Sequence, residues 1–298
     1  MTDADAYSHQ PVLLAEVLDQ LITDRGGLYL DATLGLGGHS DAILRAISGK
    51  VLGLDMDPDS LRRASARLAE HGPRHRAVRA NFRDAAAVLE REKFFPLAGA
   101  LFDIGVSSMH FDKGERGFSF MHEGPLDMRL DPDNPLSAAT IVNVWPEEQI
   151  ALLLKEFGEE PQAGRISRAI GEARRKGPLK TTTQLAALIE KTIGRSGGTH
   201  PATRSFQALR IAVNGELENL TRGVESVLPY LQVGGRLCVI TFHSLEDRIV
   251  KRLFDSFVSQ GLCRFIEDGA KGATKPSAEE VESNPRARSA KLRAVEKL

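Results

Sequence analysis

Several features that would assign this 298-residue chain to other classes of protein are scarce or missing. It has only two cysteines, Cys238 in an apolar run and Cys263 near an expected strand. We therefore expect neither a disulfide framework nor a cysteine-based zinc site. No apolar run approaches the roughly 18 residues of a membrane span, and the polar N-terminus lacks the apolar region of a secretory signal. The composition, 42% hydrophobic and 27% charged, is typical of a soluble globular protein, and we predict a cytoplasmic location without a membrane partner.

Familiar catalytic signatures are missing as well. The sequence contains no Walker phosphate-binding loop and no serine-centred nucleophile elbow. Its eight histidines are scattered, without a pair or a His/Asp cluster at the spacing of metal ligands, so we predict no catalytic metal. Any chemistry must therefore use other groups.

The formal net charge of −1 conceals two basic segments. Residues 164–180 contain six Lys or Arg against one Glu, and residues 284–298 contain five against one. Local basic patches on a nearly neutral protein suit a polyanionic partner. The alternative is two ordinary solvated helix faces.

Strands and helices alternate in the first third of the chain. Apolar runs predict strands over 28–31, 51–55, 77–80 and 98–103, and helical spacing predicts helices over 11–22, 41–48, 58–70 and 83–91. Asp57 before Pro58 marks the start of one of these helices. This alternation indicates a parallel sheet with helices on both faces.

The alternation stops near residue 110 and returns near residue 201. Residues 136–195 show only helical spacing, with Thr182 or Thr183 as the cap of the last helix. A helix over 202–219 follows, then a strand over 236–242 and a helix that Ser244 would cap together with Asp247. A closing strand pair is expected over 262–266 and 291–297, joined by a loop over 269–289. We predict an α/β domain formed by 1–110 and 201–298, with an inserted all-helical domain over 111–200.

A glycine turn over residues 31–40 is the strongest signal of a ligand site. Gly35, Gly37 and Gly38 lie between an expected strand and an expected helix, where the backbone can approach a ligand closely. Asp55, twenty residues past Gly35, is placed to accept hydrogen bonds from ribose hydroxyls. The third glycine of a dinucleotide fingerprint is missing, and the preceding Asp31 favours a positively charged ligand such as S-adenosylmethionine. The alternative is a purely structural turn.

Polar or aromatic residues also follow the other expected strands. Ligands of open α/β sheets bind at the carboxyl ends of the strands. Phe82 could lie against a base, and Asp103 could accept a hydrogen bond from an amine undergoing methylation or hold the methionine part of the cofactor. The alternative for Asp103 is a turn or capping carboxylate. His243 lies at a further strand end, where a structural role is more common.

The expected helix over 202–219 carries a polar stripe opposite an apolar one. The polar stripe is formed by Thr203, Gln207, Arg210 and Asn214, and the apolar stripe by Phe206, Leu209 and Val213. An ordinary solvated face explains such a stripe most simply.

Nine motifs in order resemble those of one known family, the small-subunit ribosomal RNA cytosine-N4 methyltransferase H family, also called MraW. The resemblance extends over almost the whole chain, and nine motifs in one order are highly specific. They are DATLGLGGHS (31–40), DMDP (55–58), DIGVSS (103–108), RGFSF (116–120), GPLDMR (124–129), AGRISRAI (163–170), TRSFQALRIAVN (203–214), FHSLEDRIVK (242–251) and NPRARSAKL (284–292).

The resemblance implies a class I, Rossmann-like S-adenosylmethionine-dependent methyltransferase with an inserted helical domain for RNA recognition. Its substrate would be N4 of one cytosine in the P-site region of 16S rRNA, within the small ribosomal subunit or a late precursor. The implied cofactor contacts are Gly37, Gly38, His39, Asp55, Phe82 and Asp103, with His110 where the family has a glutamine. Asp103 with Ser107 or Ser108 would be catalytic. We predict RNA contacts at Arg165, Arg168, Gln207, Arg210, Asn214, His243, Arg286 and Arg288.

Three other functions stay open from the residues alone. A non-catalytic RNA- or ribosome-binding protein could keep a vestigial cofactor site, although Gly37, Gly38, Asp55 and Asp103 are all present. A DNA amino-methyltransferase lacks support because no Pro-Pro motif follows Asp103. A nicotinamide-dependent dehydrogenase fits least well, since its third glycine is absent.

Overall fold

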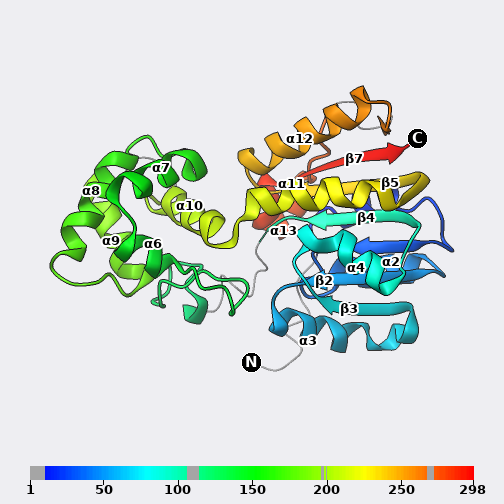
Figure 1. Cartoon of the computed structure of the whole chain (residues 1–298), viewed down its shortest axis with the longest axis horizontal. Helices are drawn as coiled ribbons and strands as arrows, with labels where there is room; N and C mark the ends of the chain where they lie inside the picture. Colours follow the sequence, from blue (N-terminus) through cyan, green and yellow to red (C-terminus); the bar gives the residue numbers. More distant parts are fainter. Residues whose placement is uncertain (1–10, 106–113, 196–197, 199, 267–271) are drawn as a thin grey trace. The chain divides into compact units, whose positions relative to one another are not determined.

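The computed structural model describes residues 11–105, 114–195, 198, 200–266 and 272–298 (Figure 1). The chain forms two compact units: residues 1–105 with 217–298 make up unit 1, and residues 106–216 make up unit 2. Ser107, Ser108 and His110 lie outside the described residues. Within the described part, no helix is long and apolar enough to cross a membrane.

Unit 1 is built on a seven-stranded sheet with the order β3-β2-β1-β4-β5-β7-β6. β3, β2, β1, β4 and β5 are parallel, and β7 runs antiparallel to both β5 and β6. The predicted parallel sheet and closing strand pair are therefore confirmed. The strands are β1 (Leu28–Asp31), β2 (Lys50–Asp55), β3 (His75–Arg79), β4 (Leu97–Asp103), β5 (Leu231–Thr241), β6 (Cys263–Phe265) and β7 (Lys291–Lys297).

Helices cover both faces of this sheet. Successive strand residues point to opposite faces, so Leu30 packs into one apolar core and its neighbour Tyr29 into another. The first core is shared with α4, α11 and α12, and the second with α1, α2 and α3. The helices are α1 (Leu14–Leu21), α2 (Gly38–Ala46), α3 (Pro58–Arg67), α4 (Ala85–Glu92), α11 (Glu216–Val227), α12 (Ser244–Ser259) and α13 (Ala278–Ser283), with 3-10 turns η2 (Leu68–Arg74), η3 (Phe82–Asp84), η5 (Leu228–Tyr230) and η7 (Pro285–Ser289).

The two cysteines lie in these two different cores and are free. Burial raises the pKa of the Cys238 thiol to about 12 and that of Cys263 to about 11. Both thiols are therefore neutral packing groups, and no disulfide joins them, as expected.

Of the three predicted helix caps, the structure confirms the one at α3 and differs at α9 and α12. Asp57 caps α3 as predicted, accepting from the backbone N–H of Asp59. Ser244 does not cap α12, because the imidazole of His243 accepts from the N–H of Glu246 while Glu246 Oε2 accepts from the N–H of His243. Thr181, not the following threonines, caps α9 (Thr182–Ile193), since it stands three residues before Gln184. The loop expected over 269–289 contains the short helix α13, and its residues 269–271 lie outside the described part.

Unit 2 is a helical domain with a core of its own. Apolar residues of every α-helix from α6 to α10 meet there, including Ile150, Ile166, Leu185 and Phe206. The helices are α6 (Ala138–Val144), α7 (Glu147–Gly158), α8 (Ala163–Arg174), α9 and α10 (Thr203–Asn214), with the 3-10 turn η4 (Gly114–Arg116) before them.

The boundary at the end of unit 2 differs from the expected one. We placed the helix after residue 201 in the sheet domain, but α10 packs against α7 in unit 2, and the unit ends at Glu216. The apolar stripe of α10, formed by Phe206, Leu209 and Val213, is buried in the helical core. Gly215, at φ +61, ends α10 so that α11 begins as a separate helix.

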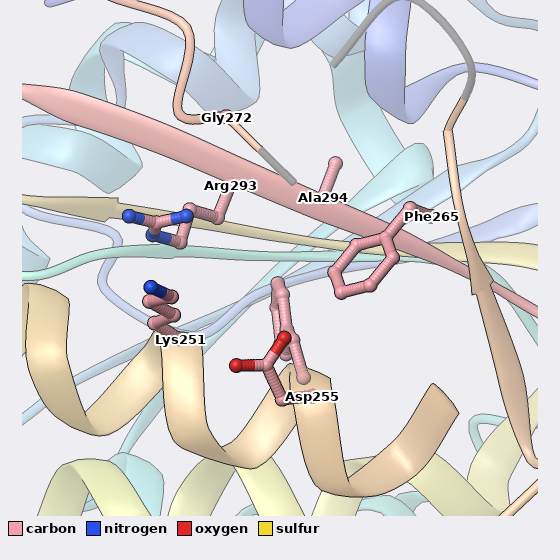
Figure 2. Close-up of a pocket in the computed structure, with 7 residues that line it drawn as sticks. Lys251, Asp255, Phe265, Gly272, Arg293 and Ala294 are labelled. Carbon is pink, nitrogen blue, oxygen red and sulfur yellow. The ribbon is translucent and has the colours of Figure 1, made fainter. Parts of the chain in front are cut away.

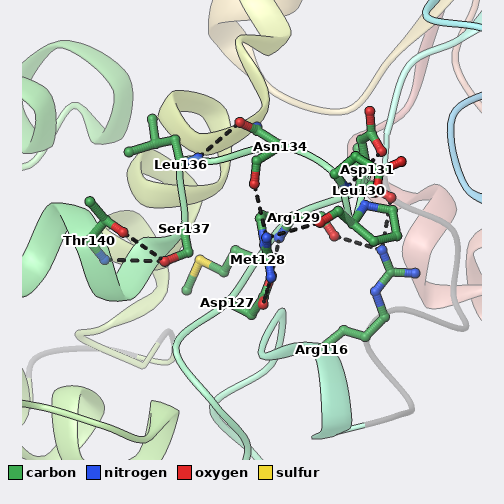
Figure 3. A network of polar contacts seen from close by, with 12 residues as sticks. Arg116, Asp127, Met128, Arg129, Leu130, Asp131, Asn134, Leu136, Ser137 and Thr140 are labelled. Carbon is green, nitrogen blue, oxygen red and sulfur yellow. Dashed lines mark hydrogen bonds and ion pairs between the residues drawn. The ribbon is translucent and has the colours of Figure 1, made fainter.

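Polar contacts order the segment before α6, where the sequence shows no period (Figure 3). The Arg116 guanidinium donates to the carbonyls of Arg129 and Leu130. Arg129 in turn makes a forked pair with Asp127, at 2.9 and 2.8 Å. Buried backbone groups need hydrogen-bond partners even where they do not belong to a helix or a strand. In this segment the side chains supply those partners.

Asp247 of α12 holds the last strand to unit 1. Its carboxylate accepts from Lys291 Nζ and from Arg293 Nε, each at 2.7 Å. Burial alone would raise the pKa of this carboxyl, but the hydrogen bonds from Arg293 and Lys291 outweigh burial and hold the pKa below its usual value. The ionised form therefore stabilises the folded state.

We expect Asp247→Asn to lower the free energy of unfolding by about 2 kcal/mol near neutral pH, because hydrogen bonds to a charged group are lost. A carboxyl whose pKa is lowered by folding stabilises the folded protein fully at pH values above its pKa in the unfolded chain. This stabilisation is lost as the pH falls through its pKa in the folded protein. The difference between the two proteins, measured by urea denaturation, should therefore shrink below about pH 4. A difference that stays constant down to about pH 3 would contradict this account.

Candidate functional site at the carboxyl edge of the sheet

The glycine turn joins β1 to α2 at the carboxyl edge of the sheet. Gly35 and Gly37 have φ values of +52 and +77, a left-handed conformation that favours glycine. A side chain on Gly38 would begin 2.5 Å from the ring of Pro11. The turn is therefore tight and depends on glycine at these positions, as predicted.

Asp55, the last residue of β2, is half-buried beside this turn. Its Oδ2 accepts from the backbone N–H of Gly35, and its Oδ1 accepts from that of Asp57, each at 2.8 Å. One carboxylate thus fixes both the glycine turn and the start of α3. Its predicted contact with a ribose stays a prediction.

Asp31 has a structural role that the sequence did not indicate. It is 1% exposed, and its Oδ2 accepts from the Ser40 hydroxyl at 2.7 Å while its Oδ1 accepts from the N–H of Thr33. Burial raises the pKa of this carboxyl. The side chain of Asp31 thus ties β1 to α2, and its expected preference for a positively charged ligand stays a prediction.

His39 and Asp103 approach each other at this edge, and both have shielded polar atoms without a hydrogen-bond partner among the described residues. Nε2 of His39, in the first turn of α2, lies 3.5 Å from Oδ2 of Asp103 at the end of β4. The N–H of Asp103 donates to the Thr33 hydroxyl at 2.6 Å, which anchors the strand end. Both ring nitrogens of His39 and Oδ1 of Asp103 are shielded from solvent yet lack a hydrogen-bond partner in the described structure. Buried polar atoms are normally paired, so this group suits a polar ligand.

Phe82 stands at the start of η3, directly after β3. Its ring packs edge-on against Phe102, with centroids 5.8 Å apart and planes at 83°. Gly223 of α11 lies behind it, where a Cβ would be 2.8 Å from Phe82 Cδ2. The ring is half-buried and held by its neighbours, which fits the predicted contact with a base.

The predicted RNA contacts on α10 are engaged within unit 2. Asn214 is buried, accepting from the N–H of Leu130 and donating to the carbonyls of Met128 and Arg210. Arg210 makes a forked pair with Glu216, at 2.9 and 3.0 Å, and Gln207 donates to the Phe157 carbonyl. The polar stripe is therefore neither a solvated face nor a free RNA surface. The buried amide of Asn214 joins α10 to the segment around Met128, which argues against the predicted RNA contact at this residue.

The other predicted RNA contacts are more exposed. Arg165 donates to the Thr192 carbonyl and Arg168 to that of Gly164, but both side chains lie at the surface of α8. Arg286 and Arg288 are exposed on η7. His243 is 12% exposed and serves as the cap of α12, which matches the structural role that we considered more common.

One group of potential metal ligands in unit 1 is explained by ion pairs. Asp41, Glu70 and His71 offer donor atoms within 4.8 Å of one another. Arg45 pairs with both carboxylates, and His71 Nε2 lies 2.7 Å from Asp41. These cationic and hydrogen-bonding partners account for the cluster without an ion.

A parallel sheet with a final antiparallel strand, a glycine turn after β1 and a carboxylate at the end of β2 define a class I S-adenosylmethionine-dependent methyltransferase. More particularly, the chain belongs to the MraW methylase family, whose sequence pattern matches residues 6–298.

Two curated relatives, both called ribosomal RNA small subunit methyltransferase H, match along nearly their whole length. One from Symbiobacterium thermophilum is 48% identical, covering 98% of each chain. One from Carboxydothermus hydrogenoformans is 45% identical, again covering 98% of each. A solved rRNA methylase from Streptococcus thermophilus aligns over 96% of this chain and 93% of its own, with 12% identity and a TM-score of 0.46.

Proposed function

We propose that this protein methylates N4 of a cytosine in the P-site region of 16S rRNA, within the small ribosomal subunit or a late precursor, in the cytoplasm. Support comes from the family and from the name shared by its relatives. The observation in the structure that carries the proposal is the His39–Asp103 pair beside the glycine turn, whose shielded atoms lack hydrogen-bond partners among the described residues.

The residues present fit S-adenosylmethionine. Gly37 and Gly38 keep the turn tight where α2 begins. Asp55 would accept from the ribose, and Phe82 would lie against the adenine. His39 and Asp103 would meet the polar methionine part, because their shielded atoms need partners. When bound, the cofactor supplies an electrophilic methyl group on its sulfonium.

Asp103 is our proposed acceptor for the hydrogens of the cytosine amine. The N4 lone pair is delocalised into the ring, so N4 is a poor nucleophile until its geometry becomes pyramidal. A carboxylate that holds an amine hydrogen favours that change, stabilises the positive charge that develops on nitrogen, and can accept the proton that N4 loses as it gains the methyl group. Ser107 or Ser108, outside the described residues, would assist. The target base must leave its stack to reach this pocket.

Unit 2 is our proposed RNA-recognition domain. Residues 164–180 carry its basic segment, with Arg165 and Arg168 on the exposed side of α8. Arg286 and Arg288 add exposed positive charge on η7 of unit 1. Such residues would hold phosphates and position the RNA without reading its sequence.

The test is mass spectrometry of 16S rRNA from cells with and without the intact gene. We expect an N4-methyl mark on one P-site cytosine that disappears on deletion and returns when the purified protein and S-adenosylmethionine are added to small subunits. Calorimetric titration with S-adenosylhomocysteine and with NAD separates the other functions, and only the former should bind. An unchanged methylation pattern would reject the proposed substrate.

A further inference from the structure

A small hollow, partly open to solvent, lies between α12 and the last two strands of unit 1 (Figure 2). Its walls come from three elements that are far apart in the sequence. The lining residues are Lys251, Phe254 and Asp255 of α12, Phe265 of β6, Arg293 and Ala294 of β7, and Gly272. None of these residues belongs to the carboxyl-edge site described above.

Two cations lie at one side of this hollow. Figure 2 shows the Lys251 ammonium beneath the Arg293 guanidinium. Arg293 pairs with Asp247 through Nε, and Lys251 has no ion pair or hydrogen bond with any described residue. Arg248 and Arg252 add exposed positive charge on the same helix. Asp247 and Asp255 offset part of this charge, but the four cations outnumber these two carboxylates, so the surface around the hollow suits a phosphate.

Phe265 and Asp255 supply the remaining features of a nucleotide site. Phe265, on the three-residue edge strand β6, is half-buried and presents its ring to the hollow. Asp255 is exposed one helical turn after Lys251 and has no ion pair with a described residue. An aromatic face can stack a base, and a carboxylate can accept from a ribose hydroxyl or a base amine.

The hollow and the proposed site of methylation lie on opposite faces of the sheet, since Asp103 faces α2 and Arg293 faces α12. In the sheet, Asp103 pairs with Ile240 of β5, and Arg293 pairs with the preceding residue, Val239. The backbones of Arg293 and Asp103 are therefore two strands apart, or about 10 Å along the sheet, and an RNA strand would pass around the carboxyl edge to reach both. Stacked nucleotides of one strand rise by about 3.4 Å each, so this path takes several nucleotides.

We propose that this hollow binds one unpaired nucleotide of the RNA substrate, several positions from the target cytosine. Lys251 and Arg293 hold its phosphate, Phe265 stacks its base, and Asp255 accepts from the ribose or the base. The proposal rests on the function proposed above, and it makes α12 and β7 a second RNA surface, within the methyltransferase domain.

The test compares Lys251→Glu with Arg63→Glu. Arg63 is an exposed residue of α3, with no ion pair to a described residue, so it provides the same charge change on a different helix of unit 1. Binding of a short fluorescent single-stranded RNA is measured over a range of salt concentrations. We expect Lys251→Glu to weaken binding and to lower the steepness of its salt dependence by about 0.7, the value for one phosphate contact. Equal effects of the two substitutions would overturn the proposal.

Phe265→Leu tests the stacking contact without changing charge. We expect RNA affinity to fall by about fivefold with an unaltered salt dependence, because a stacked base is lost but no phosphate contact is. Unchanged affinity would remove Phe265 from the site. Titration with S-adenosylhomocysteine should give wild-type affinity for both hollow variants, which shows that the fold and the cofactor site are intact.

Methylation of 16S rRNA in small subunits, measured in parallel, separates the two proposals. If the wild type methylates this RNA and Lys251→Glu raises KM for the subunit with kcat unchanged, both stand. If the wild type binds RNA through the hollow but does not methylate 16S rRNA, only the proposed function fails. If methylation occurs and Lys251→Glu matches Arg63→Glu in KM and in binding, only the hollow fails.

Discussion

Asp103→Ala should lower kcat for RNA methylation by about 10²- to 10³-fold, the cost typical of removing one preorganised group that stabilises a transition state. The carboxylate ends β4, its backbone is anchored on Thr33, and its Oδ1 is shielded and unpaired in the described structure. It is thus held in place before the substrate arrives. Single-turnover rates with saturating S-adenosylmethionine and saturating small subunits measure the effect on the chemical step.

Asp103→Asn is the matched control because it keeps the size and one acceptor oxygen while removing the charge. We expect a smaller loss of kcat than for alanine. Because Asp103 is also a proposed cofactor contact, the affinity for S-adenosylhomocysteine must be measured for each variant by calorimetry. Near-normal turnover of Asp103→Ala with the cofactor site saturated would exclude the proposed role.

Asp55→Ala should weaken binding of S-adenosylhomocysteine by about 100-fold or more. Each hydrogen bond to a charged group contributes about 1.5–3 kcal/mol, and a factor of ten in affinity corresponds to about 1.4 kcal/mol. This carboxylate receives the backbone N–H groups of Gly35 and Asp57 and is the proposed ribose acceptor. Its removal therefore loosens the glycine turn and deletes a ligand contact together.

Calorimetry gives the affinity, and urea denaturation gives the accompanying loss of stability. Asp19→Ala, which removes an exposed carboxylate from α1, is the control and should change neither quantity. If Asp55→Ala lost stability but kept its affinity for the cofactor product, Asp55 would be a structural residue only. Loss of affinity with unchanged stability would instead show that the ribose contact dominates.

Local patterns were enough to predict most of unit 1. The apolar runs that became β1, β2 and β4 are short and bounded by charged residues, glycine or proline, and the closing pair of β6 and β7 was visible in the same way. The glycine turn was equally clear, because φ values such as that of Gly37 favour glycine and leave a direct mark on the sequence.

The predictions from the sequence failed where one local pattern fits two tertiary arrangements. The helix over 203–214 has an apolar stripe that could face a sheet or other helices, and only its burial against α7 assigned it to unit 2. Its polar stripe gave no sign that Asn214 bonds to the segment around Met128. Likewise, an imidazole can cap a helix as a serine does, so His243 displaced Ser244 at α12.

Neighbouring residues encode the α/β alternation, the nucleoside-type glycine turn and, through nine ordered motifs, the family, so each could be predicted before the fold was known. The burial of Asp31, the approach of His39 to Asp103, and the hollow lined by Lys251, Arg293 and Phe265 became visible only in the folded chain. These contacts join residues far apart in the chain. They depend on how the strands and helices pack against one another, and the spacing of apolar residues along the chain does not specify that packing.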